Sequence, residues 1–452
     1  MVDQMDYRLA FILPETGQLL GMQCSGPPEF PRIRIPMWRR TAEMLTRTIE
    51  ERWSVKTLVL DILPSASLTP CAVIEVRSPA WEFTNAGLMA VALNSISTLS
   101  LTSEERASLH SLMEGKDASR GAFSRIGWIE EAQSWIQAAV KGLEISSTDE
   151  MLQLNGGGEF CLLRLRTQSG SAYWLKAVGG PNKHEYGITT YLAMHYASYL
   201  PRIMAAREDW NAWVMEDCGP SLQSSASLAD FEQAVARLSC LQKKLIGRTE
   251  DLLAVHCGDH RLGTLRKHID EIIGYLNEAM CLQVSTKAPK LSGPRLREIG
   301  SVLHLACEAM QALEIPDSLM HSDISPGSIL KNGRDCVFTD WCEAYIGNPF
   351  ITLEQLCVHA TRNTETPGPW VRSLRRVYRS CWLDILTEQQ IDRAFTLVPI
   401  ISVLSYLYGR GNWLRSSQRY EPAFLSYSRG LARHMDRIAA SHDLQEALCR
   451  PN

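Results

Sequence analysis

The first third of the chain alternates short apolar segments with turn-forming residues, and longer stretches repeat their apolar side chains at helical spacing. Four segments have the length and composition of β-strands: residues 8–13, 19–24, 57–63 and 71–77. Three others carry a helical period: residues 37–53, 103–115 and 126–143. This mixture predicts a separate α/β domain over residues 1–140.

The pattern changes near residue 152, where strand-like segments follow one another closely. Four strands are expected here, at residues 160–166, 172–178, 199–203 and 212–215. The first two flank the turn Gln168-Ser169-Gly170 and predict a hairpin, and a helix is expected over residues 185–199. We therefore expect a small β-rich lobe over residues 141–219.

Helical periods dominate the remainder of the chain. They cover residues 228–247, 263–282, 294–313, 352–361, 370–385, 388–413 and 422–440. A large helical lobe is therefore expected over residues 220–452, and the fold class of the whole chain is α+β. Because no low-complexity linker separates the parts, we expect them to be packed together.

Composition narrows the possible partners and the compartment. Of the 452 residues, 45% are hydrophobic and 21% are charged, which is typical of a globular protein. The net charge of -4 and the lack of a dense basic cluster argue against nucleic acid or an acidic membrane surface as a partner. The N-terminus lacks the features of a signal peptide, and the apolar run 395–408 contains Pro399 and predicts a buried helix. Thirteen cysteines without a C-x-x-C pair favour a reduced, cytoplasmic protein.

Residues 319–348 contain two aspartates in unusual surroundings. Asp323 lies in a bend-forming loop, and Asp340 ends a short predicted strand that follows the tight turn 331–334. Each aspartate alone is also a common turn-capping residue. Together they suit phosphoryl transfer, in which one carboxylate accepts the proton of the attacking hydroxyl and another holds the Mg²⁺ that neutralises the phosphates.

Spaced motifs in the same stretch agree with this chemistry. They are His321-Ser322-Asp323, then Thr339-Asp340-Trp341, then Ile346-Gly347-Asn348-Pro349. The stretch resembles the catalytic segment of the aminoglycoside phosphotransferase family, which has a protein-kinase-like bilobal fold. One position departs from the family pattern, because Ser328 stands where the family has asparagine.

The resemblance implies a small-molecule kinase that moves the γ-phosphate of ATP or GTP to a hydroxyl acceptor. It implies that Asp323 is the catalytic base, that Asp340 binds Mg²⁺ and that Ser328 occupies the second metal-ligand position. A serine hydroxyl is shorter than an asparagine amide, so a second metal would bind more weakly or turnover would be lost. The alternative is a catalytically impaired pseudokinase that acts as a nucleotide-binding or interaction module.

The predicted small lobe contains candidate nucleotide ligands. Gly156, Gly157 and Gly158 precede the first strand of the hairpin, where a loop covering the nucleotide is expected, although their spacing is not G-x-G-x-x-G. Lys176 lies among apolar residues of the second strand, where it either meets the α- and β-phosphates or extends from an edge strand into solvent. Glu185 opens the following helix, where it either pairs with Lys176 or forms a capping box with Asn182.

Two further segments resemble parts of known protein families. Glu216 and Cys218 lie in a polar turn that corresponds to the family's hinge, whose backbone meets the nucleotide base. Residues 47–55 faintly resemble the end of a Nudix box, but Thr48 and Arg52 replace metal-binding carboxylates. The N-terminal domain is thus expected to be a degenerate Nudix-like domain or an unrelated structural one.

Overall fold

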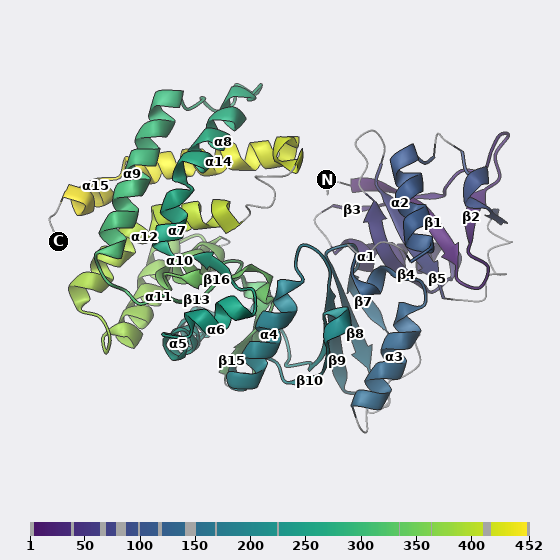
Figure 1. The fold of residues 1–452 in the computed structure, drawn as a ribbon, viewed down its shortest axis with the longest axis horizontal. Coiled ribbons are helices and arrows are strands. Elements are labelled where there is room, and N and C mark those ends of the chain that lie inside the picture. The colour runs from purple at the N-terminus through teal and green to yellow at the C-terminus, as the bar shows by residue number, and fades with distance from the viewer. Residues whose placement is uncertain are drawn as a thin grey trace. The chain divides into compact units, whose positions relative to one another are not determined.

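The computed structural model describes residues 4–37, 40–63, 69–77, 87–97, 100–115, 120–140, 151–167, 170–223, 226–333, 335–362, 364–409 and 417–449. The chain forms two compact units (Figure 1). The first unit comprises Met1–Tyr186 and Pro201–Asp217, and the second comprises Gly187–Leu200 and Cys218–Asn452. The chain leaves the first unit for the last time between Asp217 and Cys218, within the predicted hinge.

The N-terminal part of the first unit is a sheet with strand order β4-β5-β1-β2-β6, with β3 also paired to β1. Its strands are β1 (Gln4–Leu13), β2 (Gln18–Met22), β3 (Arg32–Pro36), β4 (Thr57–Leu63), β5 (Cys71–Val76) and β6 (Leu88–Val91). Only β1 and β5 run parallel. Helix α1 (Thr41–Trp53) buries Leu45 and Ile49 with one face of this sheet. The apolar spacing of α1 therefore explains which face of this helix is buried.

The second sheet of the first unit is antiparallel, in the order β10-β11-β9-β8-β7. Its strands are β7 (Leu152–Asn155), β8 (Phe160–Arg166), β9 (Ala172–Val178), β10 (Ile203–Arg207) and β11 (Ala212–Glu216). Helix α3 (Trp128–Ala139) lies against it in Figure 1 and contributes Trp128 and Ile136 to a core that also contains Ile12 of β1 and Leu175 of β9. The two sheets thus share one hydrophobic core, closed at the other end by α2 (Ser103–Met113).

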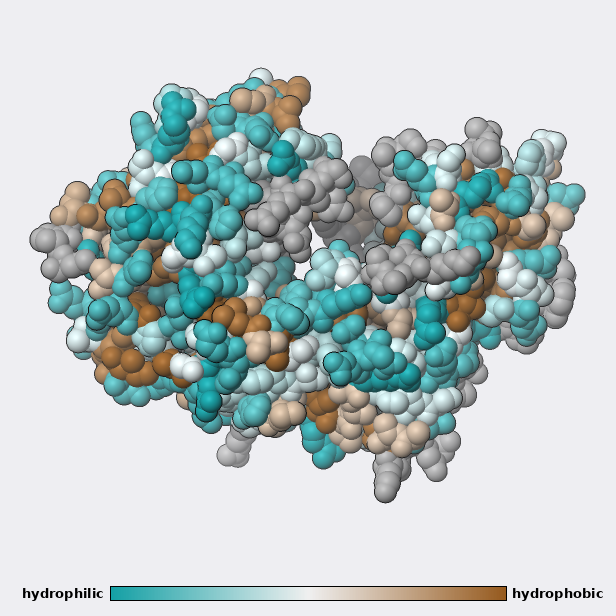
Figure 2. Space-filling view, in the orientation of Figure 1, coloured by the Kyte–Doolittle hydropathy of each residue, from teal (hydrophilic) through white to brown (hydrophobic). Residues whose placement is uncertain are grey.

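The second unit is mainly helical and has its own core. Its helices are α5 (Leu228–Lys244), α6 (Thr249–Ala254), α7 (Leu262–Lys267), α8 (Ile269–Cys281), α9 (Gly293–Gln311), α10 (Phe350–Thr361), α11 (Pro367–Trp382), α12 (Glu388–Gly409), α14 (Pro422–Ala439) and α15 (His442–Cys449). Among the described residues, α12 alone is long and apolar enough to span a membrane, but 67% of that apolar window is buried inside the protein. Its buried side chains belong to the core of the second unit. Hydrophilic side chains predominate on the face of the protein shown in Figure 2.

The structure confirms the α+β class and the order of a β-rich part before a helical part, but it changes several boundaries. The predicted helix 263–282 is two helices, because the backbone of His268 leaves the helical conformation between α7 and α8. The segment 199–203 is not a strand until Ile203, where β10 begins. The predicted turn residues Gln168 and Ser169, and residues 410–413 of the predicted helix 388–413, lie outside the described residues.

Candidate functional site

A two-stranded hairpin in the second unit organises the segments that carry Asp323 and Asp340. Strand β13 (Ser318–His321) leads into the Asp323 loop, and the hairpin of β14 (Ile329–Asn332) and β15 (Asp335–Phe338) follows. At its open end, the Thr339 amide donates to the Ser328 carbonyl at 3.0 Å. The loop with Asp323 therefore enters the hairpin at the end from which the chain continues to Asp340.

His321 joins these two segments. Its Nε2 lies 2.9 Å from the carbonyl oxygen of Thr339, which can only accept, so Nε2 carries the hydrogen. Its backbone amide donates to Thr352 Oγ1 at 3.0 Å, and its ring lies 4.8 Å from that of Trp341. His321 thus supports the loop through hydrogen bonds.

Asp340 adopts a backbone conformation that is rare for a residue with a side chain. Its φ of 71° and ψ of 56° are left-handed, and its side chain is exposed at the start of the short 3-10 helix Trp341–Glu343. Such conformations cost about 1–3 kcal/mol and persist only where the surroundings enforce them. The carbonyl of Glu343 accepts from the Ser322 amide at 2.8 Å, which fixes the segment after Asp340 to the loop before Asp323.

The resemblance implies that Ser328 occupies a metal-ligand position, but its hydroxyl is bonded within its own loop. Its hydroxyl accepts from the Ser325 amide and donates to the Ser325 carbonyl, both at 2.9 Å, and the residue is buried. These bonds close the turn Pro326–Ser328 as a capping box. One lone pair of the hydroxyl remains for any further partner, so the residue is primarily a structural element of the loop.

In the first unit, Lys176 and Glu185 form a buried ion pair. The lysine Nζ on β9 lies 2.6 Å from Oε1 of Glu185, at the start of α4 (His184–His195), and the two side chains are 5% and 1% exposed. The rings of Phe160 and Trp213 lie 5.3 and 5.8 Å from Nζ. Of the two roles considered for Glu185, its side chain takes the pairing with Lys176, and the Glu185 amide donates to the Asn182 carbonyl at 2.9 Å.

The three glycines lie in the turn between β7 and β8. The sequence pattern did not predict β7, which precedes them. A Cβ on Gly156 would lie 2.7 Å from the carbonyl oxygen of Val59 in β4. Gly157 has a φ of +145° and nothing within 4 Å of such an atom, and Gly158 faces Asp61 of β4 at 3.6 Å. Contact with the N-terminal sheet therefore accounts for Gly156, whereas the contact at Gly158 is an ordinary one that a side chain could also make, and Gly157 faces open space.

The predicted hinge residues occupy the end of β11 and the residues after it. The Glu216 amide donates to the Arg202 carbonyl at 3.0 Å, and its carboxylate pairs with the Arg202 guanidinium. Asp217 follows, with its amide on the carbonyl of Ala172 and its carboxylate 2.7 Å from Arg164 Nη2. Cys218 is partly exposed and is the first residue of the second unit's main segment.

A residue that the sequence patterns did not single out lies electrostatically close to Asp323. Burial and the nearby Arg362 lower the pKa of His359, and the Asp323 carboxylate opposes that shift. His359 follows Thr352 by two turns of α10, so it shares a face with the residue that holds the His321 amide. The seven-residue spacing between Thr352 and His359 is the sequence pattern that could have indicated that they share a helix face. Glu354 of the same helix pairs with Arg375 at 2.8 Å.

Comparison with known proteins gives structural neighbours. No family model matches the chain, and no curated protein sequence matches it. A choline/ethanolamine kinase family protein from Mesorhizobium loti has a TM-score of 0.47 and 15% identity, covering 71% of this chain and 97% of that one. Plasmodium vivax ethanolamine kinase has a TM-score of 0.48 and 13% identity, covering 77% and 97%. Aminoglycoside phosphotransferase from Alicyclobacillus acidocaldarius has a TM-score of 0.41 and 12% identity, covering 69% and 93%. The neighbours are thus small-molecule phosphotransferases, the class that the sequence motifs resemble.

Proposed function

We propose that the chain is a cytoplasmic phosphotransferase that moves the γ-phosphate of ATP or GTP to a hydroxyl group of a small molecule. The observation that carries this proposal is the hairpin, which ties the loop of Asp323 to the left-handed Asp340. Strained backbone at a carboxylate is typical of functional sites, since it gives no benefit to stability. The second carboxylate, in the loop that the hairpin fixes, supplies the base that phosphoryl transfer uses.

Asp323 acts as the catalytic base in this proposal. It accepts the proton of the acceptor hydroxyl while the acceptor oxygen forms a bond to the γ-phosphorus. The bond between the γ-phosphorus and the bridging oxygen of the nucleoside diphosphate breaks, and the diphosphate leaves with that electron pair. Lys176 neutralises charge on the α- and β-phosphates, and Glu185 holds the lysine in place. Glycines 156–158 and the backbone at Glu216 and Cys218 would contact the nucleotide.

Magnesium fits the oxygen donors of the Asp340 segment. The Asp340 carboxylate is exposed and hard, as Mg²⁺ prefers, and the remaining lone pair of the Ser328 hydroxyl is a second and weaker oxygen donor. When bound, the ion would neutralise negative charge on the phosphates. Asp340 and Ser328 would hold it.

Thermal unfolding tests this function directly. We would titrate the full chain with ATP and with GTP, each with and without Mg²⁺, because binding to the folded state raises the melting temperature. Ligand at about 100 times its Kd stabilises the bound unit by about 2.7 kcal/mol. A Mg²⁺-dependent shift supports the proposal and identifies the donor nucleotide, whereas no shift at millimolar nucleotide contradicts it.

The Asp323→Asn variant separates catalysis from binding. We expect it to keep the nucleotide-dependent shift and to lose phosphate transfer to a panel of small hydroxyl acceptors. Asp335→Asn is a matched control, because Asp335 lies at the turn end of the same hairpin and pairs with Arg237 at 3.3 Å. Full transfer activity in Asp323→Asn would refute the assignment of the base.

One observation favours a second candidate function, a nucleotide-binding pseudokinase. The Ser328 hydroxyl already makes two hydrogen bonds within its own loop, which leaves less donor capacity for a second metal. A pseudokinase would show the nucleotide-dependent thermal shift without transfer to any acceptor. The acceptor screen with the unchanged chain therefore decides between the two functions.

A further inference from the structure

A β-bulge in β4 connects the N-terminal sheet to the glycine turn. The pairing of β4 with β5 slips between Val59 and Asp61, which leaves Leu60 as the extra residue. The Leu60 carbonyl accepts from Ser124 Oγ at 3.2 Å. Bulges bend a strand and redirect its polar groups, so the backbone here is available to partners outside its own sheet.

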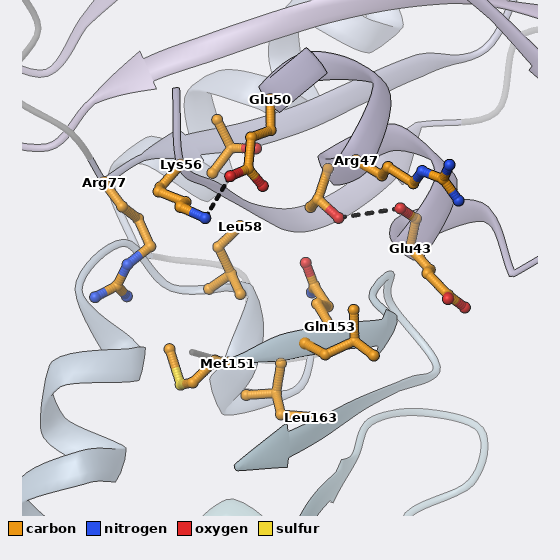
Figure 3. A pocket seen from close by; sticks show the side chains of 12 residues that line it. Glu43, Arg47, Glu50, Lys56, Leu58, Arg77, Met151, Gln153 and Leu163 are labelled. Atoms are coloured by element: carbon orange, nitrogen blue, oxygen red, sulfur yellow. Dashed lines mark hydrogen bonds and ion pairs between the residues drawn. The ribbon is translucent and has the colours of Figure 1, made fainter. Parts of the chain in front are cut away.

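Gln153 of β7 uses that backbone. Its Oε1 accepts from the Val59 amide and its Nε2 donates to the Val59 carbonyl, both at 2.8 Å, and the residue is 4% exposed. β4 and β7 each lie at the edge of their own sheet, so this single side chain joins two edges without a continuous ladder. Figure 3 shows Gln153 on β7 beneath α1, at a pocket of about 210 Å³ that is lined by residues of α1, β4 and β7.

The glycine turn begins three residues after Gln153 and packs against β4 as well. Gly156 lies against the Val59 carbonyl, and Gly158 lies against Asp61, whose carboxylate pairs with Arg120. A Cβ on Gly179 would lie 2.3 Å from the Gly158 carbonyl oxygen, so this side of the turn is closely packed as well. The turn is therefore held from the N-terminal sheet, although its glycines are intrinsically the most flexible residues.

We propose that Gln153, together with the Asp61–Arg120 pair, is a positioning element that holds the glycine turn in a shape ready for the nucleotide. This inference rests on the proposed function, since it assigns residues to the handling of the phosphate donor. A turn fixed before binding loses less conformational freedom when the nucleotide arrives. The N-terminal sheet thus takes part in nucleotide affinity without touching the nucleotide.

Gln153→Ala is the first test. It removes both bonds to Val59, and we expect the KM for the nucleotide to rise about tenfold, because the turn must then be ordered when the nucleotide binds, while the KM for the acceptor stays unchanged. Gln153→Glu keeps the size and the bond from the Val59 amide but replaces the donor to the Val59 carbonyl. We expect it to show an intermediate effect that lessens at lower pH, where a protonated carboxyl donates again.

Two further variants keep the test decisive. Asp61→Asn breaks the ion pair with Arg120 without changing size, so it reports on the turn if Gln153→Ala does not fold. Ile35→Val is the matched control, because Ile35 is buried in β3, which pairs with β1 and not with β4, and its loss of one methyl group lowers stability away from the turn. We expect that control to lower the melting temperature and to leave the nucleotide KM unchanged.

Amide hydrogen exchange provides a readout that does not depend on activity. Exchange measured by mass spectrometry over residues 156–160 should become at least about tenfold faster in Gln153→Ala and Asp61→Asn than in the unchanged chain, and should not change in Ile35→Val. Unchanged exchange in both turn variants would overturn the positioning role, whatever the activity. Faster exchange in a chain that binds no nucleotide would instead refute the proposed function and leave the structural coupling intact.

Discussion

Removing one partner of the Lys176–Glu185 pair should destabilise the first unit far more than an ordinary surface substitution would. In Glu185→Leu, the ammonium group of Lys176 stays buried between the rings of Phe160 and Trp213 without its carboxylate. Removing one partner of a buried ion pair costs about 3–5 kcal/mol, because the remaining charge loses the attraction that offset its desolvation. The attraction of the two rings recovers only about 1–2 kcal/mol of that cost.

The same physics predicts that a double substitution restores stability but not function. Lys176→Met with Glu185→Leu replaces the pair by apolar side chains of similar volume, which is often neutral for stability. We expect the free energy of unfolding of the double variant to lie within about 2 kcal/mol of that of the unchanged chain. It should nevertheless show no nucleotide-dependent thermal shift, because it lacks the lysine that is proposed to meet the α- and β-phosphates.

Scanning calorimetry and urea unfolding provide the measurement. For a unit of roughly 200 residues, the single variant should lower the melting temperature by about 10 °C, at about 2–4 °C for each kcal/mol. Glu50→Leu is the control, because Glu50 pairs with Lys56 in the same unit but both side chains are about half exposed, and it should cost less than about 1 kcal/mol. If Glu185→Leu costs no more than this control, the pair is solvated and the reasoning is refuted.

The remaining predictions concern the second unit. Ser328→Asn should lower the Mg²⁺ concentration needed for half-maximal transfer while reducing stability by about 1 kcal/mol, because the hydroxyl bonds to Ser325 are lost; an unchanged metal dependence would contradict it. Asp340→Gly should be about 1 kcal/mol more stable than Asp340→Ala, since glycine tolerates the left-handed backbone, yet both should be inactive in the transfer assay. Burial lowers the pKa of His260 to about 3. Below the ordinary histidine pKa of about 6.5, the unfolded chain therefore binds a proton at His260 that the folded chain does not bind. As the pH is lowered from about 6.5 towards about 3, the free energy of unfolding should fall by about 1.4 kcal/mol per pH unit. His260→Phe keeps a ring stacked on Tyr345 and should flatten this pH dependence in urea unfolding; an equal slope in the variant would count against His260 as its source.

The sequence patterns predicted most elements that bury a regular apolar face. Strands β8 and β9 and helix α9 lie where the alternation and the helical period put them, because each contributes several side chains to a core. Strand β7 has only four residues, and its Gln153 is a polar residue buried through a hydrogen bond, so no hydrophobic pattern marked it. Strand β3 lies at an edge and alternates arginine with isoleucine. This alternation is typical of a half-buried strand, so β3 was predictable from the sequence although it was not predicted.

The candidate site was predictable where chemistry constrains spacing in the chain. The distance from Asp323 to Asp340 in the sequence is set by one hairpin, and the Lys176–Glu185 pair by one turn between β9 and α4. Spacing in the sequence does not determine which partners a short side chain bonds. Ser328 aligns with a metal ligand, but its hydroxyl bonds to Ser325 because a three-residue turn offers an amide and a carbonyl at closer range.

The glycine turn shows why a residue type alone does not identify a ligand. Glycine is required wherever backbone must come close to something, and that partner can be a phosphate or another strand. Gly156 would meet the Val59 carbonyl with any larger side chain, so its identity follows from packing against the N-terminal sheet. Gly157 has no such neighbour and keeps a φ of +145° that other residues rarely adopt. Packing therefore accounts for the first glycine, and only the second has the open surroundings that close approach of a phosphate requires.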